Sequence, residues 1–146
     1  MIAATASKSL RAVGGLLIGL GVVHIAATPH IPKLLRGSSP AVYERVVGPM
    51  LLNHVLVGVL LIPLGLTTWL AALGCQRGEA WASRVVVTNT IVVFVLPLSI
   101  AAFMRRSEYY TAPLFLTGVL LTTVISLLMA IATVSLARTQ GRGSHK

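Results

Sequence analysis

The sequence predicts an all-α integral membrane protein, a bundle of four transmembrane helices. Of its 146 residues 55% are hydrophobic and only 10% are charged, and the mean hydropathy is +0.88. Soluble domains carry about 25% charged residues. The chain also contains four apolar runs, each near the ~20 residues that a helix needs to cross the hydrocarbon layer. Such a length accommodates one bundle, so we expect a single transmembrane domain over residues 1–146.

The four runs cover residues 12–31, 47–73, 83–104 and 112–137. Lys8 and Arg11 precede the first run, and Pro113 falls in the first turn of the fourth, where proline is favoured. Pro63 and Pro97 lie inside the second and third runs. Because each of these prolines removes one backbone donor, we expect both helices to be kinked.

The connection between the first two runs, residues 32–46, is more than a turn. Ser39-Pro40 has the pattern of a helix N-cap followed by proline at the first helical position. The sequence AVYERVV that follows predicts a short helix. We expect this helix to meet the second span at a break at Gly48-Pro49.

The first run has a second interpretation, a secretory signal. Lys8 and Arg11 form a basic start, and the sequence IAA at 25–27 offers small residues for cleavage. Cleavage there would leave three spans. The run is long for a signal and contains His24, and both features favour a retained first helix.

Basic residues in the loops predict the orientation, because cytoplasmic loops carry an excess of Lys and Arg. One side has Lys8, Arg11, Arg77, Arg84, Arg138, Arg142 and Lys146, and the other has Lys33, Arg36, Arg45, Arg105 and Arg106. Seven against five favours both termini in the cytoplasm. The location that we expect is the bacterial inner (plasma) membrane.

The formal net charge is +9, with twelve Lys and Arg against three acidic residues. The basic residues lie in every loop rather than in one stripe, which argues against nucleic-acid binding. We expect the lipid bilayer as their partner, since a basic residue gains about 1 kcal/mol beside anionic headgroups.

Small proton-coupled multidrug exporters need a carboxylate inside the membrane. Glu44, Glu79 and Glu108 all lie outside the runs, which argues against that class.

Small residues mark the helix faces that we expect to pack closely. The first run contains a GxxxG pair at Gly15 and Gly19 and also Gly21, and the second contains Gly58 and Gly65. The fourth run carries a stripe of Gly118, Thr122, Ser126 and Ala130. Packing within the chain and packing against other membrane subunits both satisfy this pattern.

Two histidines fall within the first two runs, which is unusual because an ionisable group inside a membrane is costly. His24 and His54 each lie about seven residues from the external end of their span, which is roughly 10 Å below the surface at the helical rise. Gly21 and Gly58 lie one turn away from them. We therefore predict that the two rings face each other, in an intramembrane polar cluster of His24, Thr28, Asn53 and His54.

Three interpretations of this cluster stay open. The first is a structural hydrogen-bonded cluster. The second is ligation of a b-type haem by His24 and His54, because two axial histidines are the essential signature of such a site. The third is a transition-metal site that adds Met50 or His30, since imidazole and thioether suit copper. No dense His/Met motif predicts a metal, and Cys75, the only cysteine, forms no CxxC motif.

The external side also gathers basic residues. We predict a basic mouth for an anionic headgroup or substrate, formed by His30, Lys33, Arg36, Arg45, Arg105 and Arg106. The nearby sequence YERVVGPMLLNH at 43–54 resembles the Glu-Arg…Asn pattern of the glutathione-using, four-span membrane enzymes of eicosanoid metabolism. Gly48 stands where that pattern has a second arginine, and Asn53 falls one residue late. The resemblance implies a lipid- or glutathione-acting enzyme with its site at this mouth.

Together these features predict an accessory, scaffold or small-ligand-binding membrane component. A haem-binding electron carrier or oxidoreductase that uses His24 and His54 is the alternative, and the lipid- or glutathione-acting enzyme is a weaker one. The sequence leaves open whether the protein is an enzyme. It also leaves the cofactor unknown, with haem b as the candidate.

Overall fold

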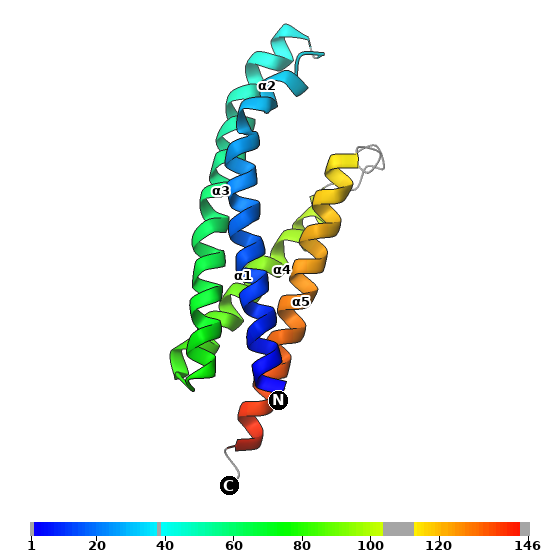
Figure 1. The fold of residues 1–146 in the computed structure, drawn as a ribbon. Helices are drawn as coiled ribbons and strands as arrows, with labels where there is room; N and C mark the ends of the chain where they lie inside the picture. The colour runs from blue at the N-terminus through cyan, green and yellow to red at the C-terminus, as the bar shows by residue number, and fades with distance from the viewer. Residues whose placement is uncertain (1, 38, 104–112, 144–146) are drawn as a thin grey trace. The chain divides into compact units, whose positions relative to one another are not determined.

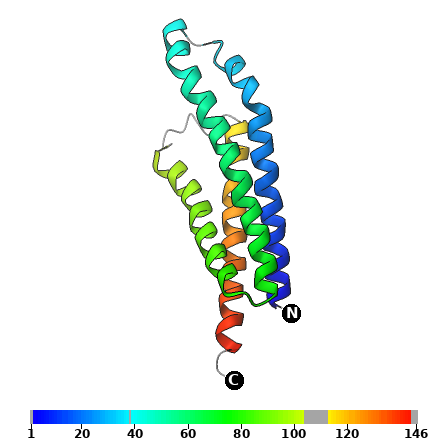
Figure 2. The same ribbon diagram turned by 90° about the vertical axis from the view of Figure 1, so that its left-hand side faces the viewer.

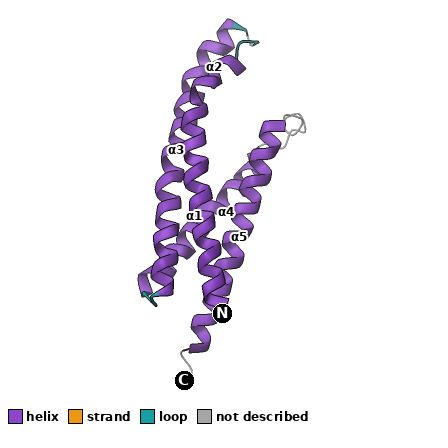
Figure 3. Ribbon diagram, in the orientation of Figure 1, coloured by secondary structure: helices purple, strands orange, loops and turns teal. Residues whose placement is uncertain are grey.

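The computed structural model describes residues 2–37, 39–103 and 113–143, and this part of the chain is almost entirely helical (Figures 1 and 3). The elements are α1 (Ile2–Ala27), the 3-10 turn η1 (Thr28–His30), α2 (Ile31–Leu34), α3 (Pro40–Gln76), α4 (Ala80–Phe103) and α5 (Pro113–Gly143). Four segments of the described residues are long and apolar enough to cross a membrane: Ala4–Lys33, Pro40–Gln76, Ala80–Phe103 and Leu116–Arg138. The predicted all-α, four-span membrane fold is confirmed.

The helices extend beyond the apolar runs from which they were predicted. α1 begins at Ile2, because the segment before the first run contains good helix formers, namely three alanines, Lys8, Leu10 and Arg11. α3 begins at Pro40, as Ser39-Pro40 predicts, and the Tyr43 amide donates to the Ser39 carbonyl at 2.9 Å. The run ends predicted at 104 and 112 lie outside the described residues.

The break predicted at Gly48-Pro49 is wrong. α3 continues through both Pro49 and Pro63 as one helix of 37 residues. A proline withholds only one backbone donor, whereas a real break would leave several backbone groups without partners. In an apolar setting each of those groups costs several kcal/mol, so the continuous helix is favoured.

The chain forms two compact units. The first unit contains Met1–Gly14 and Thr67–Lys146, so it joins the start of α1 and the end of α3 to α4 and α5. Its core is aliphatic and is drawn from all four helices. The buried side chains include Leu10, Val13, Ala71, Ala72, Val86, Val93, Ile125 and Met129.

Hydroxyl groups link the helices of this first unit. The Ser7 Oγ on α1 donates to the Ala72 carbonyl on α3 at 2.7 Å. The hydroxyls of Thr90 on α4 and Thr133 on α5 are 2.7 Å apart, and α4 runs beside α5 over this part (Figure 2). These bonds satisfy the hydroxyl groups of Ser7, Thr90 and Thr133, which is favourable in an apolar interior.

The second unit, Gly15–Leu66, is a helical hairpin. It contains the rest of α1, η1, α2 and the first part of α3, and its two long helices lie side by side (Figures 1 and 2). Leu17 and Leu61 are its buried aliphatic side chains. Both histidines predicted to meet belong to this hairpin.

Candidate histidine site

The rings of His24 on α1 and His54 on α3 are in direct contact. Their centroids are 4.7 Å apart and their planes are tilted by 50°. Aromatic rings in contact have centroids about 4.5–7 Å apart, so this pair lies at the close end of the range. The sequence-based prediction that these two rings face each other therefore matches the structure.

A backbone hydrogen bond fixes the His24 ring. Its Nδ1 lies 3.0 Å from the Leu20 carbonyl, one turn earlier in α1. A carbonyl oxygen only accepts, so Nδ1 carries the hydrogen and, in the neutral ring, Nε2 keeps the lone pair. Histidines that bind metals usually donate their other N–H in this way, which orients the ligating nitrogen.

His54 has an unsatisfied nitrogen. Its Nε2 is buried, and among the described residues no group forms a hydrogen bond with it. Buried polar atoms are hydrogen-bonded in the great majority of cases, so such an exception calls for an explanation. The pair thus offers the lone pair of His24 Nε2 and the unsatisfied Nε2 of His54.

Two glycines hold the helices at this distance. A Cβ added to Gly21 would lie 2.7 Å from the Gly58 carbonyl oxygen, and one added to Gly58 would lie 2.8 Å from the Gly21 oxygen and 3.2 Å from the His24 Cβ. The two backbones therefore touch one turn away from the rings. Any larger residue at either position would separate the helices and the histidines with them.

The other two members of the predicted cluster do not join the pair. Thr28 Oγ1 donates at 2.9 Å to the His24 carbonyl within α1, the usual bond of a threonine inside a helix. Asn53 was expected to be buried, but its side chain is exposed. Successive residues on a helix point about 100° apart, so the orientation that directs His54 toward α1 turns Asn53 away.

The basic residues of the predicted mouth that belong to the second unit are exposed. His30 ends η1, Lys33 lies in α2, Arg36 follows α2 and Arg45 lies near the start of α3. Arg105 and Arg106 lie outside the described residues. The proposed mouth as a whole therefore stays a prediction.

Sequence reasoning missed a polar network in the first unit. Asn89 on α4 is buried, and its Nδ2 donates to the hydroxyls of Thr67 at 2.9 Å and Thr68 at 3.0 Å on α3. The signal was present in the sequence, because Asn89 is an amide inside the third run and two adjacent threonines, Thr67 and Thr68, lie in the second. These two bonds join α4 to α3, which indicates a structural link between the helices.

Arg11 also makes a contact that the sequence did not predict. Its guanidinium carbon lies 5.3 Å from the centre of a Trp69 ring on α3. Such a cation–π contact is worth about 0.5–1 kcal/mol at an exposed site. The sequence indicated only that Arg11 is a basic residue flanking the first span, and the structure shows that it also contacts α3 within the first unit.

The geometry of the histidine pair does not fit haem. In bis-imidazole ligation the porphyrin lies between the two rings, whereas these rings contact each other. The helices have no freedom to separate locally, because Gly21 and Gly58 are in backbone contact one turn away. A ligand held by both rings must be small enough to lie at their edges.

No protein-family model, curated protein or solved structure matches this chain.

Proposed function

We propose that the protein is a small membrane component that binds a transition-metal ion through His24 and His54. The contact between the two rings carries this proposal, together with the buried and unsatisfied Nε2 of His54. A bound ion lies about 2.0–2.1 Å from each imidazole nitrogen, so the two donor atoms must be within about 4 Å of each other. Rings in contact can meet this requirement.

The charge of the surroundings favours a monovalent ion. α1 contains no acidic residue, and α3 contains none after Glu44. Two neutral imidazoles would leave the charge of the ion uncompensated, and the cost of burying an ion rises with the square of its charge. Imidazole is a good ligand for copper, whose reduced form carries a single charge. Cu(I) is therefore the ion that we propose.

The number of ligands agrees with this choice. Zinc in proteins is almost always bound by four ligands or by three with a water. Among the described residues, no three His, Cys, Asp or Glu side chains gather into a possible metal site. Cu(I) accepts two nitrogen ligands, so the histidine pair suffices for it.

A competition titration tests the proposal. Purified protein in mild detergent would compete with a chromophoric Cu(I) chelator under reducing conditions. We expect one Cu(I) per chain, with affinity reduced at least tenfold in His24→Ala and in His54→Ala. His30→Ala is the matched control, because His30 is an exposed histidine of the same hairpin, and it should bind as the unchanged protein does.

Two results would contradict the metal site. One is unchanged Cu(I) affinity in either of the two variants, and the other is no competition by the unchanged protein. The histidine pair would then be a structural contact within an accessory or scaffold protein. Zn(II) in place of Cu(I) should bind more weakly, because the site offers two neutral ligands.

The location that we propose is the bacterial inner (plasma) membrane, with both termini in the cytoplasm. The excess of basic residues on the side that carries the termini supports this orientation. Anionic lipid headgroups, and other membrane subunits, are the proposed partners. The small residues at exposed positions such as Gly118 on α5 are compatible with a neighbouring subunit.

A further inference from the structure

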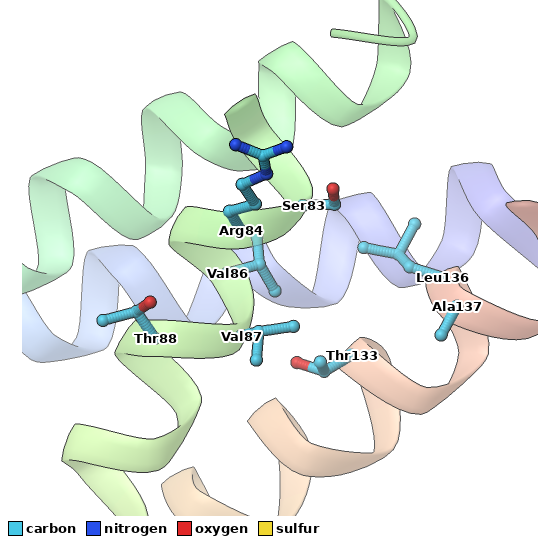
Figure 4. A pocket seen from close by; sticks show the side chains of 8 residues that line it. All are labelled: Ser83, Arg84, Val86, Val87, Thr88, Thr133, Leu136 and Ala137. Atoms are coloured by element: carbon cyan, nitrogen blue, oxygen red, sulfur yellow. The ribbon is translucent and has the colours of Figure 1, made fainter. Parts of the chain in front are cut away.

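A groove between α4 and α5 in the first unit is separate from the histidine pair. It has a volume of about 400 Å³, within the range of small-molecule pockets. Its lining residues are Ser83, Arg84, Val86, Val87, Thr88, Thr133, Leu136 and Ala137 (Figure 4). We infer that this groove binds an anionic phospholipid, with Arg84 at the headgroup and the aliphatic residues along an acyl chain.

The groove has a charged end and an apolar interior. Arg84 lies about 6 Å along α4 from its first residue, Ala80, which is the depth of the headgroup region. On the other wall, Ala137 is followed by Arg138, the last residue of the fourth apolar segment. Arg84 is the charged residue among those that line the groove, and Val87 and Leu136 belong to its apolar lining.

The charge of Arg84 calls for an anion. The one acidic residue among the described residues of this unit is Glu79. Its carboxylate lies 3.8 Å from the Arg77 guanidinium and accepts a hydrogen bond of 2.6 Å from Trp81 Nε1. Glu79 thus interacts with residues of its own turn. A lipid phosphate would provide the negatively charged partner for Arg84. Basic pockets between membrane helices bind anionic headgroups in this way.

The interior of the groove suits a hydrocarbon chain. Thr133 Oγ1 donates to the Met129 carbonyl at 2.8 Å and also contacts the Thr90 hydroxyl. Its hydroxyl therefore needs no hydrogen bond from a ligand. Ser83 Oγ likewise donates to the Ala80 carbonyl at 3.1 Å. Thr88 also lines the groove, and the apolar lining consists of Val86, Val87, Leu136 and Ala137, of which Val87 is 46% exposed.

Native mass spectrometry tests the inference. The protein would be released from mixed micelles that contain phosphatidylglycerol and phosphatidylcholine with identical acyl chains. We expect one retained phosphatidylglycerol per chain and about fivefold less retention in Arg84→Gln, the effect of one basic residue at a membrane surface. Arg77→Gln is the matched control at the same end of the unit, because Arg77 already faces Glu79.

A second variant tests the groove itself without a change of charge. Ala137→Leu fills the apolar wall and should lower the retention of phosphatidylglycerol, whereas Ala101→Leu, at an exposed position of α4 outside the groove, should not. Circular dichroism would confirm that each variant is folded. Inorganic phosphate at equal concentration should not displace the lipid, since it lacks the acyl chain.

Several outcomes would overturn the inference. Equal retention of the two lipids by the unchanged protein would show that the charge of the headgroup does not contribute to binding. If folded Arg84→Gln or Ala137→Leu retained as much phosphatidylglycerol as the unchanged protein, the groove would not be the binding site of the lipid. If Ala137→Leu instead abolished self-association and left lipid retention intact, the groove would be a contact between copies of this chain.

Discussion

Gly21 and Gly58 set the distance between α1 and α3 in the hairpin. Each faces the backbone of the other helix, and a Cβ at either position would approach a carbonyl oxygen closer than 3.0 Å. The GxxxG pair at Gly15 and Gly19 was predicted to mark a face that packs closely, either within the chain or against another subunit. Around Gly19 a Cβ would meet nothing within 4 Å, so Gly19 makes no close contact within the described residues, and its packing against another subunit stays a prediction.

The first prediction compares alanine substitutions at these glycines. Gly58→Ala should destabilise the protein by about 1–3 kcal/mol, the usual cost of overpacking, because the Gly21 carbonyl belongs to a rigid backbone. Gly19→Ala should be neutral or slightly stabilising, since alanine favours a helix over glycine by about 0.5–1 kcal/mol. Unfolding in mild detergent measures both. Equal effects would show that the backbone contact at Gly58 is absent.

The second prediction concerns the coupling of the histidines. The rings touch, so His24→Ala and His54→Ala should be non-additive by about 0.5 kcal/mol or more in a double-mutant cycle of unfolding. Asn53→Ala combined with His24→Ala is the control, because exposed Asn53 should be additive with His24 within about 0.5 kcal/mol. If the two substitutions changed the free energy of unfolding additively, the two rings would not be in contact, and the proposed metal site would be excluded.

The pairing of the histidines was predictable from sequence, whereas other site residues were not. His24 and His54 are at matched distances from a short connection, so their depth follows from the helical rise alone. Asn53 differs from His54 only by its rotation about the helix axis, and that rotation depends on which face α1 contacts. The bond of Asn89 to Thr67 and Thr68 needed the relative register of α3 and α4, which periodicity does not supply.

At the scale of whole elements, the turn from α3 to α4 shows how one helix ends and the next begins. The Glu79 amide donates to the Gly74 carbonyl at 3.0 Å, and the Gly78 amide donates to the Cys75 carbonyl at 3.3 Å. This pair of bonds is a Schellman motif, with Gly78 in the left-handed conformation at φ 74°. The Ala82 amide then donates to the Glu79 carbonyl and begins α4.

The third prediction tests this helix end. Gly78→Val should cost about 1–2 kcal/mol of stability, because an L-residue is strained in the left-handed conformation. Gly78→Asn should lose less, since asparagine adopts that conformation more readily than other side-chain-bearing residues. Gly37→Val is the control in the other described turn, where φ is not positive. Equal losses at both glycines, measured by thermal unfolding in detergent, would contradict this account.

Element boundaries were less predictable than element number. Hydropathy identifies the four spans because the apolar runs are long, but helices continue into polar flanks that hydropathy ignores. The end of α3 is at Gln76, just before the left-handed Gly78, and its start is at Pro40, after a recognisable cap. Local backbone chemistry therefore locates the two ends of α3 better than hydrophobicity does.

At the scale of the molecule, the even number of spans determines where the termini lie. Within the first unit, the N-terminal end of α1 and the C-terminal end of α5 are at the same end (Figure 1). The turn from α3 to α4 lies toward that end as well. Crossing the membrane four times requires both termini to be on one side. Which side that is depends on charge.

The fourth prediction tests the orientation. The side with the termini carries seven basic residues against five on the other side, and positive loops are retained in the cytoplasm. Reporter fusions after Lys146 and within residues 76–82 should therefore both be cytoplasmic. Fusions within residues 35–39, between α2 and α3, should be external and serve as the control. Reporters on opposite sides at Lys146 and at 76–82 would contradict the four-span count, whereas a common external signal would reverse the orientation and leave the count intact.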